Sequence, residues 1–211
     1  MLLTVVDYGV GNLRSIAKSI EKANSDNNLN YSIKVSSDVG DIKKSDKIVL
    51  PGQGSFKACK SGIDNIKGLQ EELNESVLGK KKPIYGICAG MQLFATTGHE
   101  GEKTPGLNWI PGEVIKLNLN SSELKIPHMG WNELKVENVS KVFKDVTNKN
   151  HAYFIHSYEF IPNDKKTISI TTDYGKDIIA AVSSGNIFGS QFHPEKSQNT
   201  GIKILTNFLN L

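Results

Sequence analysis

The sequence has little cysteine, almost no arginine and no long apolar run. Two cysteines in 211 residues are too few for a disulfide framework. No stretch approaches the roughly 18 apolar residues that a membrane-spanning helix needs. Residues 1–9 lack basic residues, and Asp7 interrupts their short apolar run, so they do not have the pattern of a secretory signal peptide. These absences predict a cytoplasmic protein with reduced thiols and no membrane contact.

Charge is not clustered either. The 25 basic and 22 acidic residues give a net charge of +3, and the basic residues are spread along the chain apart from the lysines at 80–82. A nucleic-acid interface needs basic residues gathered on one face, so none is predicted. The length fits one domain, residues 1–211, that can bury a sizeable core.

Apolar patterns predict an α/β fold with a mostly parallel central sheet flanked by helices. In the first half, short apolar runs predict strands at 2–6, 31–35, 47–50 and 83–87, and helical spacing predicts helices at about 13–23, at 63–78 and from Met91 onward. Strands that alternate with helices indicate a parallel sheet. The second half is strand-rich and partly antiparallel, with strands predicted at 113–119, 133–136, 152–160, 167–172, 178–183 and 187–192. Ser184-Gly185 predicts a hairpin, and a last helix follows His193.

The pattern G-x-C-x-G at residues 86–90 lies between a predicted buried strand and a predicted helix. This is the thiol form of a nucleophile elbow, whose tight turn requires small residues two before and two after the nucleophile. The N-terminus of the following helix favours the thiolate, and the backbone N–H of Ala89 is free to stabilise an oxyanion. We therefore predict that Cys88 is a nucleophile rather than a core cysteine.

A thiolate nucleophile needs a base, and the base needs an orienting group. His193 follows the predicted strand 187–192, and Glu195 lies two residues further along. The two side chains face the same way if the backbone is extended, and Pro194 stiffens that geometry. A histidine near a glutamate is common on surfaces, but together with Cys88 the pair predicts a Cys–His–Glu triad.

A loop with two glycines, Pro51-Gly52-Gln53-Gly54, ends the predicted strand 47–50. Such a loop can turn backbone N–H groups toward an anion, although an ordinary turn between a strand and a helix has the same pattern.

These three segments resemble, in order and separation, the class I (triad) glutamine amidotransferases over essentially the whole chain. Four more segments are similar to the glutaminase subunits of imidazole glycerol phosphate synthases: DYGVGNL at 7–13, PHMGWN at 127–132, YFIHSY at 153–158 and HPEKS at 193–197. The resemblance implies that Cys88 attacks the side-chain amide of glutamine, that His193 transfers the proton to the departing ammonia, and that Glu195 orients His193. Water then releases glutamate from a γ-glutamyl thioester.

The resemblance also implies the remaining site residues. The substrate-binding set comprises Gly52, Gln53 and Gly54 of the oxyanion strand, Ala89, Gln92, His156, Ser157 and Tyr158. Ammonia is expected to pass to a (β/α)8-barrel cyclase in a heterodimer that makes imidazole glycerol phosphate, with Asn12, Met129, Trp131 and Lys196 as interface candidates. No metal or organic cofactor is implied, and the His and Cys spacing offers no zinc pattern.

Other residues invite simpler interpretations. Cys59 has neither an elbow nor a nearby histidine, and we interpret it as a bystander thiol. His99 and His151 lie in polar sequence and are expected to face solvent. His128 fits an interface or structural packing equally well, Trp109 is expected to pack in the core or a turn, and Arg14 fits a solvated helix residue or an interface residue.

Three other functions remain open from the sequence. A related amidotransferase that supplies ammonia for amidation of a surface sugar has the same motifs. A stand-alone cysteine or ester hydrolase has the same elbow, but it leaves Gln92 and the segment around His156 without a role. A non-catalytic binding module is disfavoured by the complete set of Cys88, His193 and Glu195.

Overall fold

The computed structural model describes residues 1–119 and 124–211 of the chain. The strands of its main sheet are β1 (Leu2–Val6), β2 (Ser32–Ser36), β3 (Lys47–Leu50), β4 (Ile84–Ile87), β9 (Lys135–Val136), β12 (Ile168–Asp173), β13 (Asp177–Ser184) and β14 (Ile187–Ser190). Their order is β2-β1-β3-β4-β14-β13-β12-β9. The pairs from β2 to β14 are parallel, and those from β14 to β9 are antiparallel. The predicted fold class is confirmed.

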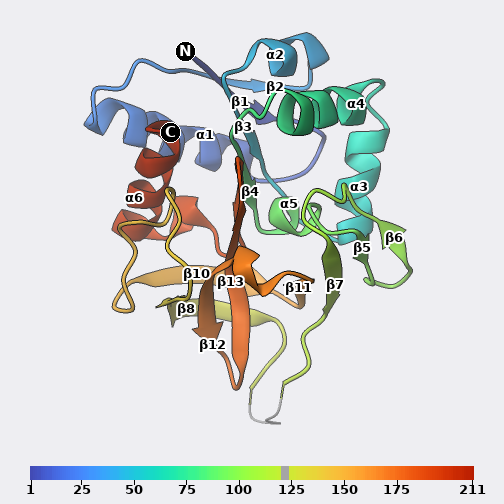
Figure 1. Cartoon of the computed structure of the whole chain (residues 1–211), viewed down its shortest axis with the longest axis vertical. Coiled ribbons are helices and arrows are strands. Elements are labelled where there is room, and N and C mark those ends of the chain that lie inside the picture. Colours follow the sequence, from blue (N-terminus) through green and yellow to red (C-terminus); the bar gives the residue numbers. More distant parts are fainter. Residues whose placement is uncertain (120–123) are drawn as a thin grey trace.

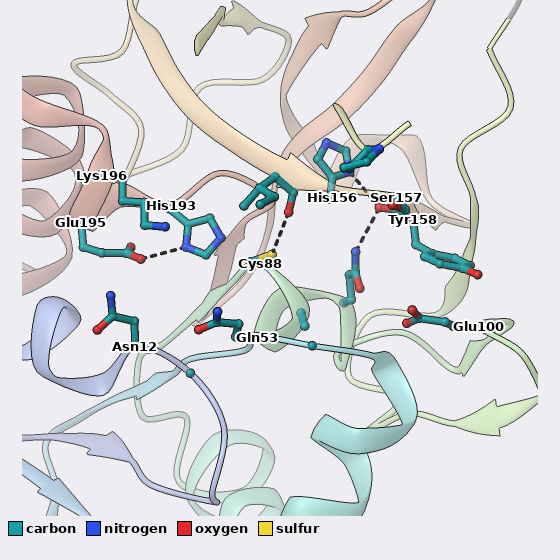
Figure 2. Close-up of a pocket in the computed structure, with 16 residues that line it drawn as sticks. Asn12, Gln53, Cys88, Glu100, His156, Ser157, Tyr158, His193, Glu195 and Lys196 are labelled. Atoms are coloured by element: carbon teal, nitrogen blue, oxygen red, sulfur yellow. Dashed lines mark hydrogen bonds and ion pairs between the residues drawn. The ribbon is translucent and has the colours of Figure 1, made fainter. Parts of the chain in front are cut away.

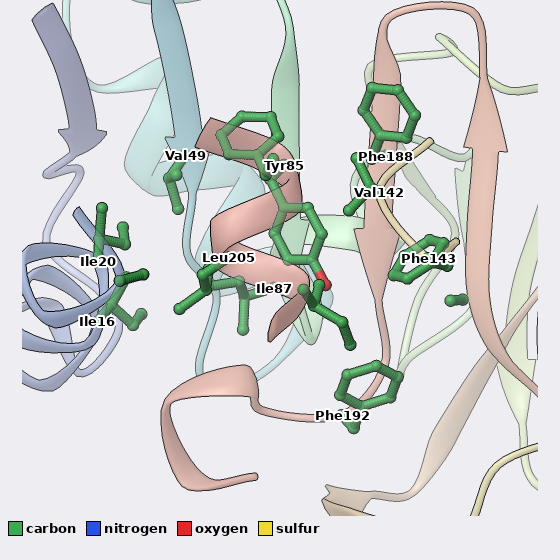
Figure 3. Close-up of a cluster of buried hydrophobic side chains, with 14 of the residues drawn as sticks. Ile16, Ile20, Val49, Tyr85, Ile87, Val142, Phe143, Phe188, Phe192 and Leu205 are labelled. Atoms are coloured by element: carbon green, nitrogen blue, oxygen red, sulfur yellow. The ribbon is translucent and has the colours of Figure 1, made fainter. Parts of the chain in front are cut away.

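Helices cover both faces of the sheet (Figure 1). They are α1 (Leu13–Asp26), α2 (Val39–Lys44), α3 (Phe56–Asp64), α4 (Leu69–Asn74), α5 (Ala89–Gln92) and α6 (Gln198–Leu209). Helices α1 and α6 lie together on one side, and α3, α4 and α5 lie on the other. The apolar side of α1 packs through Ile16 and Ile20 toward Tyr85 of β4 and Leu205 of α6 (Figure 3). Burial of this apolar surface is the main force that holds the helices on the sheet.

Two smaller sheets come from the middle of the chain. One pairs β8 (His128–Glu133) with β10 (His151–His156), and the other contains β11 (Tyr158–Pro162), β7 (Gly112–Lys116), β5 (Thr97–Gly98) and β6 (Thr104–Pro105). Figure 1 shows β8, β10 and β11 below the end of β4 at which α5 begins. They therefore lie over the carboxyl ends of the parallel strands.

Several predicted boundaries are wrong. The helix predicted at 63–78 is not one helix: α3 begins earlier, at Phe56, and ends at Asp64, and α4 begins only after Gly68, whose φ of +81° a helix does not accommodate. A π-helix, Glu75–Gly79, continues α4. The strand predicted at 152–160 is broken at Ser157 into β10 and β11, which join different sheets.

Other differences concern the second half. Residues 128–133 form β8, where only 133–136 had been predicted as strand, and β14 ends at Ser190 rather than at residue 192. The predicted hairpin is confirmed: Ser184 pairs with Ile187 across a turn in which Gly185 has a φ of +59°. Within the described residues, no helix combines the length and the apolar character needed to cross a bilayer.

Candidate active site

The chemistry-bearing segments follow adjacent parallel strands. Gly52 to Gly54 follow β3, Cys88 follows β4, and His193 comes three residues after β14 ends. Since β3, β4 and β14 are neighbours and run parallel, their carboxyl ends open at one edge of the sheet, where ligands bind in open α/β folds.

Cys88 lies on a strained turn between β4 and α5. Its φ of +55° and ψ of −115° are rare for a residue with a side chain. The turn is closed on both sides: a Cβ at residue 86 would lie 2.5 Å from Phe94 Cζ, and one at residue 90 would lie 2.0 Å from the carbonyl oxygen of Leu50. The expected need for two small residues around Cys88 thus has a steric cause. Because α5 is only one turn long, its first N–H groups contribute more to an anion site than its dipole does.

The glycine loop lies against this elbow. A Cβ on Gly52 would lie 2.0 Å from the backbone nitrogen of Gly90, so the two backbones touch. Gly54 has a φ of +96°, with nothing within 4 Å of its Cβ position. The buried hydroxyl of Tyr8 donates to the carbonyl of Pro51 at the start of the loop. The loop is thus anchored at its start and has free space around its second glycine.

His193 and Glu195 form a close pair, with Nδ1 of His193 2.8 Å from Oε1 of Glu195. The two residues are not in extended backbone, as the sequence argument supposed, because Pro194–Lys196 is a 3₁₀ turn. The backbone of His193 is fixed by its N–H, which donates to the carbonyl of Tyr153 at 3.0 Å, and by its carbonyl, which accepts from Ser197 Oγ at 2.7 Å. Figure 2 shows the imidazole between the carboxylate of Glu195 and the sulfur of Cys88.

The surroundings of His193 favour its protonated form. Burial by itself lowers the pKa of this imidazole, but hydrogen bonding and charge interactions with Cys88 and Glu195 outweigh burial and raise the pKa to about 10. With both Cys88 and His193 less than a tenth exposed, the proton is held on the imidazole when the sulfur is a thiolate. This arrangement suits a nucleophile whose base also serves as an acid.

The triad opens into a cavity of about 640 Å³, a volume in the range of small-molecule sites. Most of the residues predicted to bind substrate line it: Gln53, Gly54, Ala89, Gln92, His156, Ser157 and Tyr158. Gly52 does not, since it packs under the elbow. Gln92 donates to the carbonyl of Tyr158 at 3.1 Å, and Nδ1 of His156 lies 2.8 Å from the same carbonyl. The cavity wall opposite the elbow is thus held by side chains of the predicted set (Figure 2).

Glu100 and Gln191 lie close to the site and had not been singled out from the sequence. Glu100 lines the cavity, and its Oε2 accepts from the backbone N–H of Phe56 at 2.7 Å. Gln191 is fully buried, and its Nε2 lies 3.5 Å from the sulfur of Cys88. The only sequence signal for Gln191 is its position two residues before His193, and Glu100 lies in a segment without periodicity.

The four interface candidates lie in two places. Asn12, whose side chain accepts from the N–H of Ser15 at the start of α1, lines the cavity, as does Lys196. Met129 and Trp131 lie outside the cavity on β8 and are 58% and 49% exposed.

The remaining residues follow their simpler interpretations. Cys59 is fully buried in the hydrophobic core, and burial raises the pKa of its thiol to about 11. Trp109 is buried beside Phe94, and Arg14, His99 and His151 are exposed. His128 is buried and stacks between the rings of Phe154 and Tyr174, so packing was the better of its two interpretations. Across residues 1–119 and 124–211, no group of three or more His, Cys, Asp and Glu side chains is arranged to hold a metal ion.

Comparisons with known proteins by family, by sequence and by structure all find glutamine amidotransferases. Residues 4–211 match the family described as glutamine amidotransferase class-I. The chain is 50% identical over 211 residues to the imidazole glycerol phosphate synthase subunit HisH of Pelagibacter ubique, with 100% of each chain covered. It is 42% identical to the subunit of the same name from Cereibacter sphaeroides, with 99% of this chain and 98% of that one covered. A solved structure described as a glutamine amidotransferase has a TM-score of 0.71 at 16% identity, with 99% of both chains covered.

Proposed function

The chain belongs to the class I glutamine amidotransferase family and to its group of HisH subunits, and we propose that it hydrolyses glutamine with Cys88, His193 and Glu195 and supplies the ammonia to imidazole glycerol phosphate synthesis. The reaction serves histidine biosynthesis. The observation that carries the proposed site is that the three residues, which come from two segments about a hundred positions apart, meet in one cavity. The proposed location is the cytoplasm, where thiols such as the two free cysteines stay reduced.

The proposed mechanism begins with Cys88 as a thiolate and with His193 protonated. The thiolate of Cys88 attacks the side-chain amide carbon of glutamine, and the negative charge moves to the carbonyl oxygen. The imidazolium of His193 gives its proton to the amide nitrogen, the C–N bond breaks, and ammonia leaves a γ-glutamyl thioester. His193 then takes a proton from water, which attacks the thioester and releases glutamate. Glu195 keeps the imidazole oriented throughout.

The transient oxyanion needs donors at the elbow. The N–H of Ala89 opens α5 and has no acceptor within that helix. The peptides of the loop at Gln53 and Gly54 are the second candidate source. For the amino-acid part of glutamine we propose Gln92, His156, Ser157 and Tyr158, together with Glu100, whose carboxylate suits the α-ammonium group.

The Glu100 assignment predicts a binding defect. Glu100→Gln should raise the KM for glutamine about tenfold or more and change kcat less, because a charge-assisted hydrogen bond contributes roughly 1.5–3 kcal/mol. Glutamate release measured at a range of glutamine concentrations separates the two constants. A fall in kcat with an unchanged KM would exclude Glu100 from substrate binding.

We further propose a (β/α)8-barrel cyclase as the partner, seated on the face that carries Met129 and Trp131. Ammonia is mostly protonated at neutral pH and then no longer nucleophilic, so delivery through a closed interface keeps it neutral and excludes water. The exposed apolar side chains of Met129, Trp131 and Ile155 support an interface on this face, and the other two candidates, Asn12 and Lys196, line the cavity.

Partner and acceptor are expected to control the rate. The isolated chain should hydrolyse glutamine slowly, because the two glycines of the loop allow its peptides more than one orientation, and a misdirected peptide leaves the oxyanion hole incomplete. One missing donor costs roughly 10²–10³ in kcat. A ligand that binds the assembled state more tightly restores that rate. Steady-state glutamate release should therefore rise by about this factor when the cyclase and its ribotide acceptor are added.

The same experiment tests the function. Rates are measured for the chain alone, with the cyclase, and with the cyclase plus acceptor, while imidazole glycerol phosphate is quantified as the product. Equal rates in all three conditions would show that partner and acceptor do not control glutamine hydrolysis. Glutamate release without that product would point to another acceptor, such as a sugar. Turnover of simple esters but not of glutamine would indicate a stand-alone hydrolase.

A further inference from the structure

The proposed mechanism gives no role to three polar residues near the cavity, Asn132, His128 and Gln191. Asn132, His128, His156, Tyr158, Gln92, Gln191 and Cys88 are joined by six consecutive hydrogen bonds. We call this set the relay. The side chains of His128, His156, Gln92 and Gln191 belong to residues that are at most 6% exposed. Buried polar groups are costly unless they are paired, so an unbroken chain of this length constrains the position of every member.

The half next to the sulfur has a defined direction. Gln92 Nε2 donates to the carbonyl of Tyr158 at 3.1 Å and to Oε1 of Gln191 at 2.9 Å, so both amide hydrogens of Gln92 are used. The side-chain oxygen Oε1 of Gln191 must then face Gln92. The side-chain nitrogen Nε2 of Gln191 faces Cys88 and lies 3.5 Å from its sulfur. Gln191 thus holds the reacting sulfur from the side of the sheet, as a donor.

The half at β8 has a direction as well. Nδ1 of His156 lies 2.8 Å from the carbonyl of Tyr158, which only accepts, so Nδ1 carries the hydrogen. Nε2 of His156 then accepts from Nδ1 of His128 at 3.0 Å, and Nε2 of His128 accepts from Asn132 at 3.2 Å. Both rings must be neutral, since a second proton on either one would place two hydrogens face to face or leave no acceptor. Burial lowers the pKa of His128 to about 4 and that of His156 to about 3, which is consistent.

Strand β8 presents its two faces to different surroundings. His128 and Asn132 point inward to the relay, while Met129 and Trp131 alternate with them and point outward. Met129 lies opposite Ile155 of β10, which precedes His156. A partner that binds the outer face of β8 therefore contacts the same short strand that carries His128 and Asn132 of the relay.

We propose, on the basis of the function proposed above, that the relay positions the sulfur of Cys88 through Gln191 and connects it to the partner-facing strand β8. Gln191 contacts the reacting atom directly. His128 is a positioning residue that acts through His156 and the carbonyl of Tyr158. Binding of a partner at Met129 and Trp131 then changes the position of the Cys88 sulfur through His128 and Asn132 on the inner face of β8.

The first test is a spectroscopic measurement on the wild-type chain, with one variant used only for assignment. In the wild-type chain with ¹⁵N-labelled histidine at pH 7, long-range ¹H–¹⁵N correlation spectra should show both His128 and His156 neutral and protonated at Nδ1, the tautomer that free histidine disfavours. Loss of one signal set in His128→Phe assigns the spectra. An Nε2 proton or a positive charge on either ring would overturn the relay, whatever the activity of the chain.

The second test is a double-mutant cycle on glutamine hydrolysis. Gln191→Met removes the donor to sulfur at nearly constant size and should lower kcat about tenfold or more. His128→Phe keeps the ring stack with Phe154 and Tyr174 but removes the donor to His156, and should raise the KM for glutamine about tenfold. His128→Asn, which retains an N–H near the place of Nδ1, should recover part of this loss. His151→Gln, an exposed histidine on β10 outside the relay, is the matched control and should keep the wild-type KM.

The double variant His128→Phe/Gln191→Met tests whether the two residues act through the relay. Distant sites without shared partners combine multiplicatively in rate, so the relay predicts a combined loss in kcat/KM clearly smaller than the product of the two single losses. It also predicts a smaller activation by saturating cyclase in His128→Phe than in the wild type. Multiplicative losses with normal activation would overturn the relay and leave the proposed function intact. A wild-type chain without glutaminase activity in the complex would instead refute the proposed function, and the tautomer result would still stand.

Discussion

Replacement of Cys88 by alanine is expected to abolish glutamine hydrolysis while the complex with the cyclase still forms and still converts its acceptor when an ammonium salt is supplied. The proposed role of Cys88 is confined to the amide chemistry, because its sulfur forms the thioester and no other described side chain at the elbow can replace it. Loss of the nucleophile typically leaves only the small rate that binding and the oxyanion hole provide, several orders of magnitude below the wild type. Glutamate release and ammonium-dependent product formation, measured side by side, check both halves of this expectation.

The second cysteine provides the matched control. Cys59 is fully buried, does not line the cavity, and has a thiol whose pKa burial raises to about 11, so it stays protonated and unreactive near neutral pH. Cys59→Ala should keep glutamine hydrolysis, and a thiol-directed alkylating agent should inactivate this variant and the wild type alike. Near wild-type glutaminase activity in Cys88→Ala would refute the assignment of the nucleophile.

The sequence was most informative where backbone geometry admits few residue types. At residues 86 and 90 any Cβ would overlap Phe94 or the carbonyl of Leu50, so the spacing of two glycines around Cys88 has a single economical explanation. The parallel arrangement of β3 and β4 was also predictable, because continuous apolar runs alternating with helices imply a parallel sheet. The place of β14 beside β4 was not, because β14 follows a hairpin in the half of the chain where partly antiparallel strands were expected.

The sequence was less informative where tertiary contacts decide. The inner face of β8 carries a histidine, a glycine and an asparagine, so no apolar alternation marks the strand, and its start at residue 128 was missed. Gln191 had no signal of its own, since its contact with Cys88 depends on how β14 packs beside β4. Helix α3 did have a usable signal, because Ser55 caps it by accepting from the N–H of Ala58 at 3.2 Å.

The contact between His193 and Glu195 was predicted from the sequence, but the backbone geometry assumed for it was wrong. Alternation along an extended backbone was the argument for placing the two side chains together, but the chain turns into a 3₁₀ helix at Pro194. Proline is favoured at the first helical position because its φ is preset and its missing N–H is not needed there. The turn, rather than a strand, brings the carboxylate to 2.8 Å from Nδ1 of His193.

His193→Asn is expected to lower kcat for glutamine hydrolysis about 10²–10⁴-fold, and Glu195→Gln is expected to lower it less. His193 moves the proton in both steps, whereas orientation by Glu195 is partly replaced by the backbone contacts of His193 with Tyr153 and Ser197. Circular dichroism and thermal unfolding show whether each variant keeps its fold. A larger loss in Glu195→Gln than in His193→Asn would reverse the assigned roles.

The contact between His193 and Glu195 also predicts how kcat/KM depends on pH. The step that expels ammonia needs protonated His193, whose pKa of about 10 reflects burial, which lowers it, outweighed by Cys88 and Glu195, which raise it. Wild-type kcat/KM should therefore persist into alkaline solution and fall only as the pH rises toward that pKa. Glu195→Gln removes one of the groups that raise the pKa, so the imidazolium loses its proton at lower pH and the alkaline limb must move to lower pH. An alkaline limb at the same pH in both proteins would mean that Glu195 orients the ring without contributing to its charge.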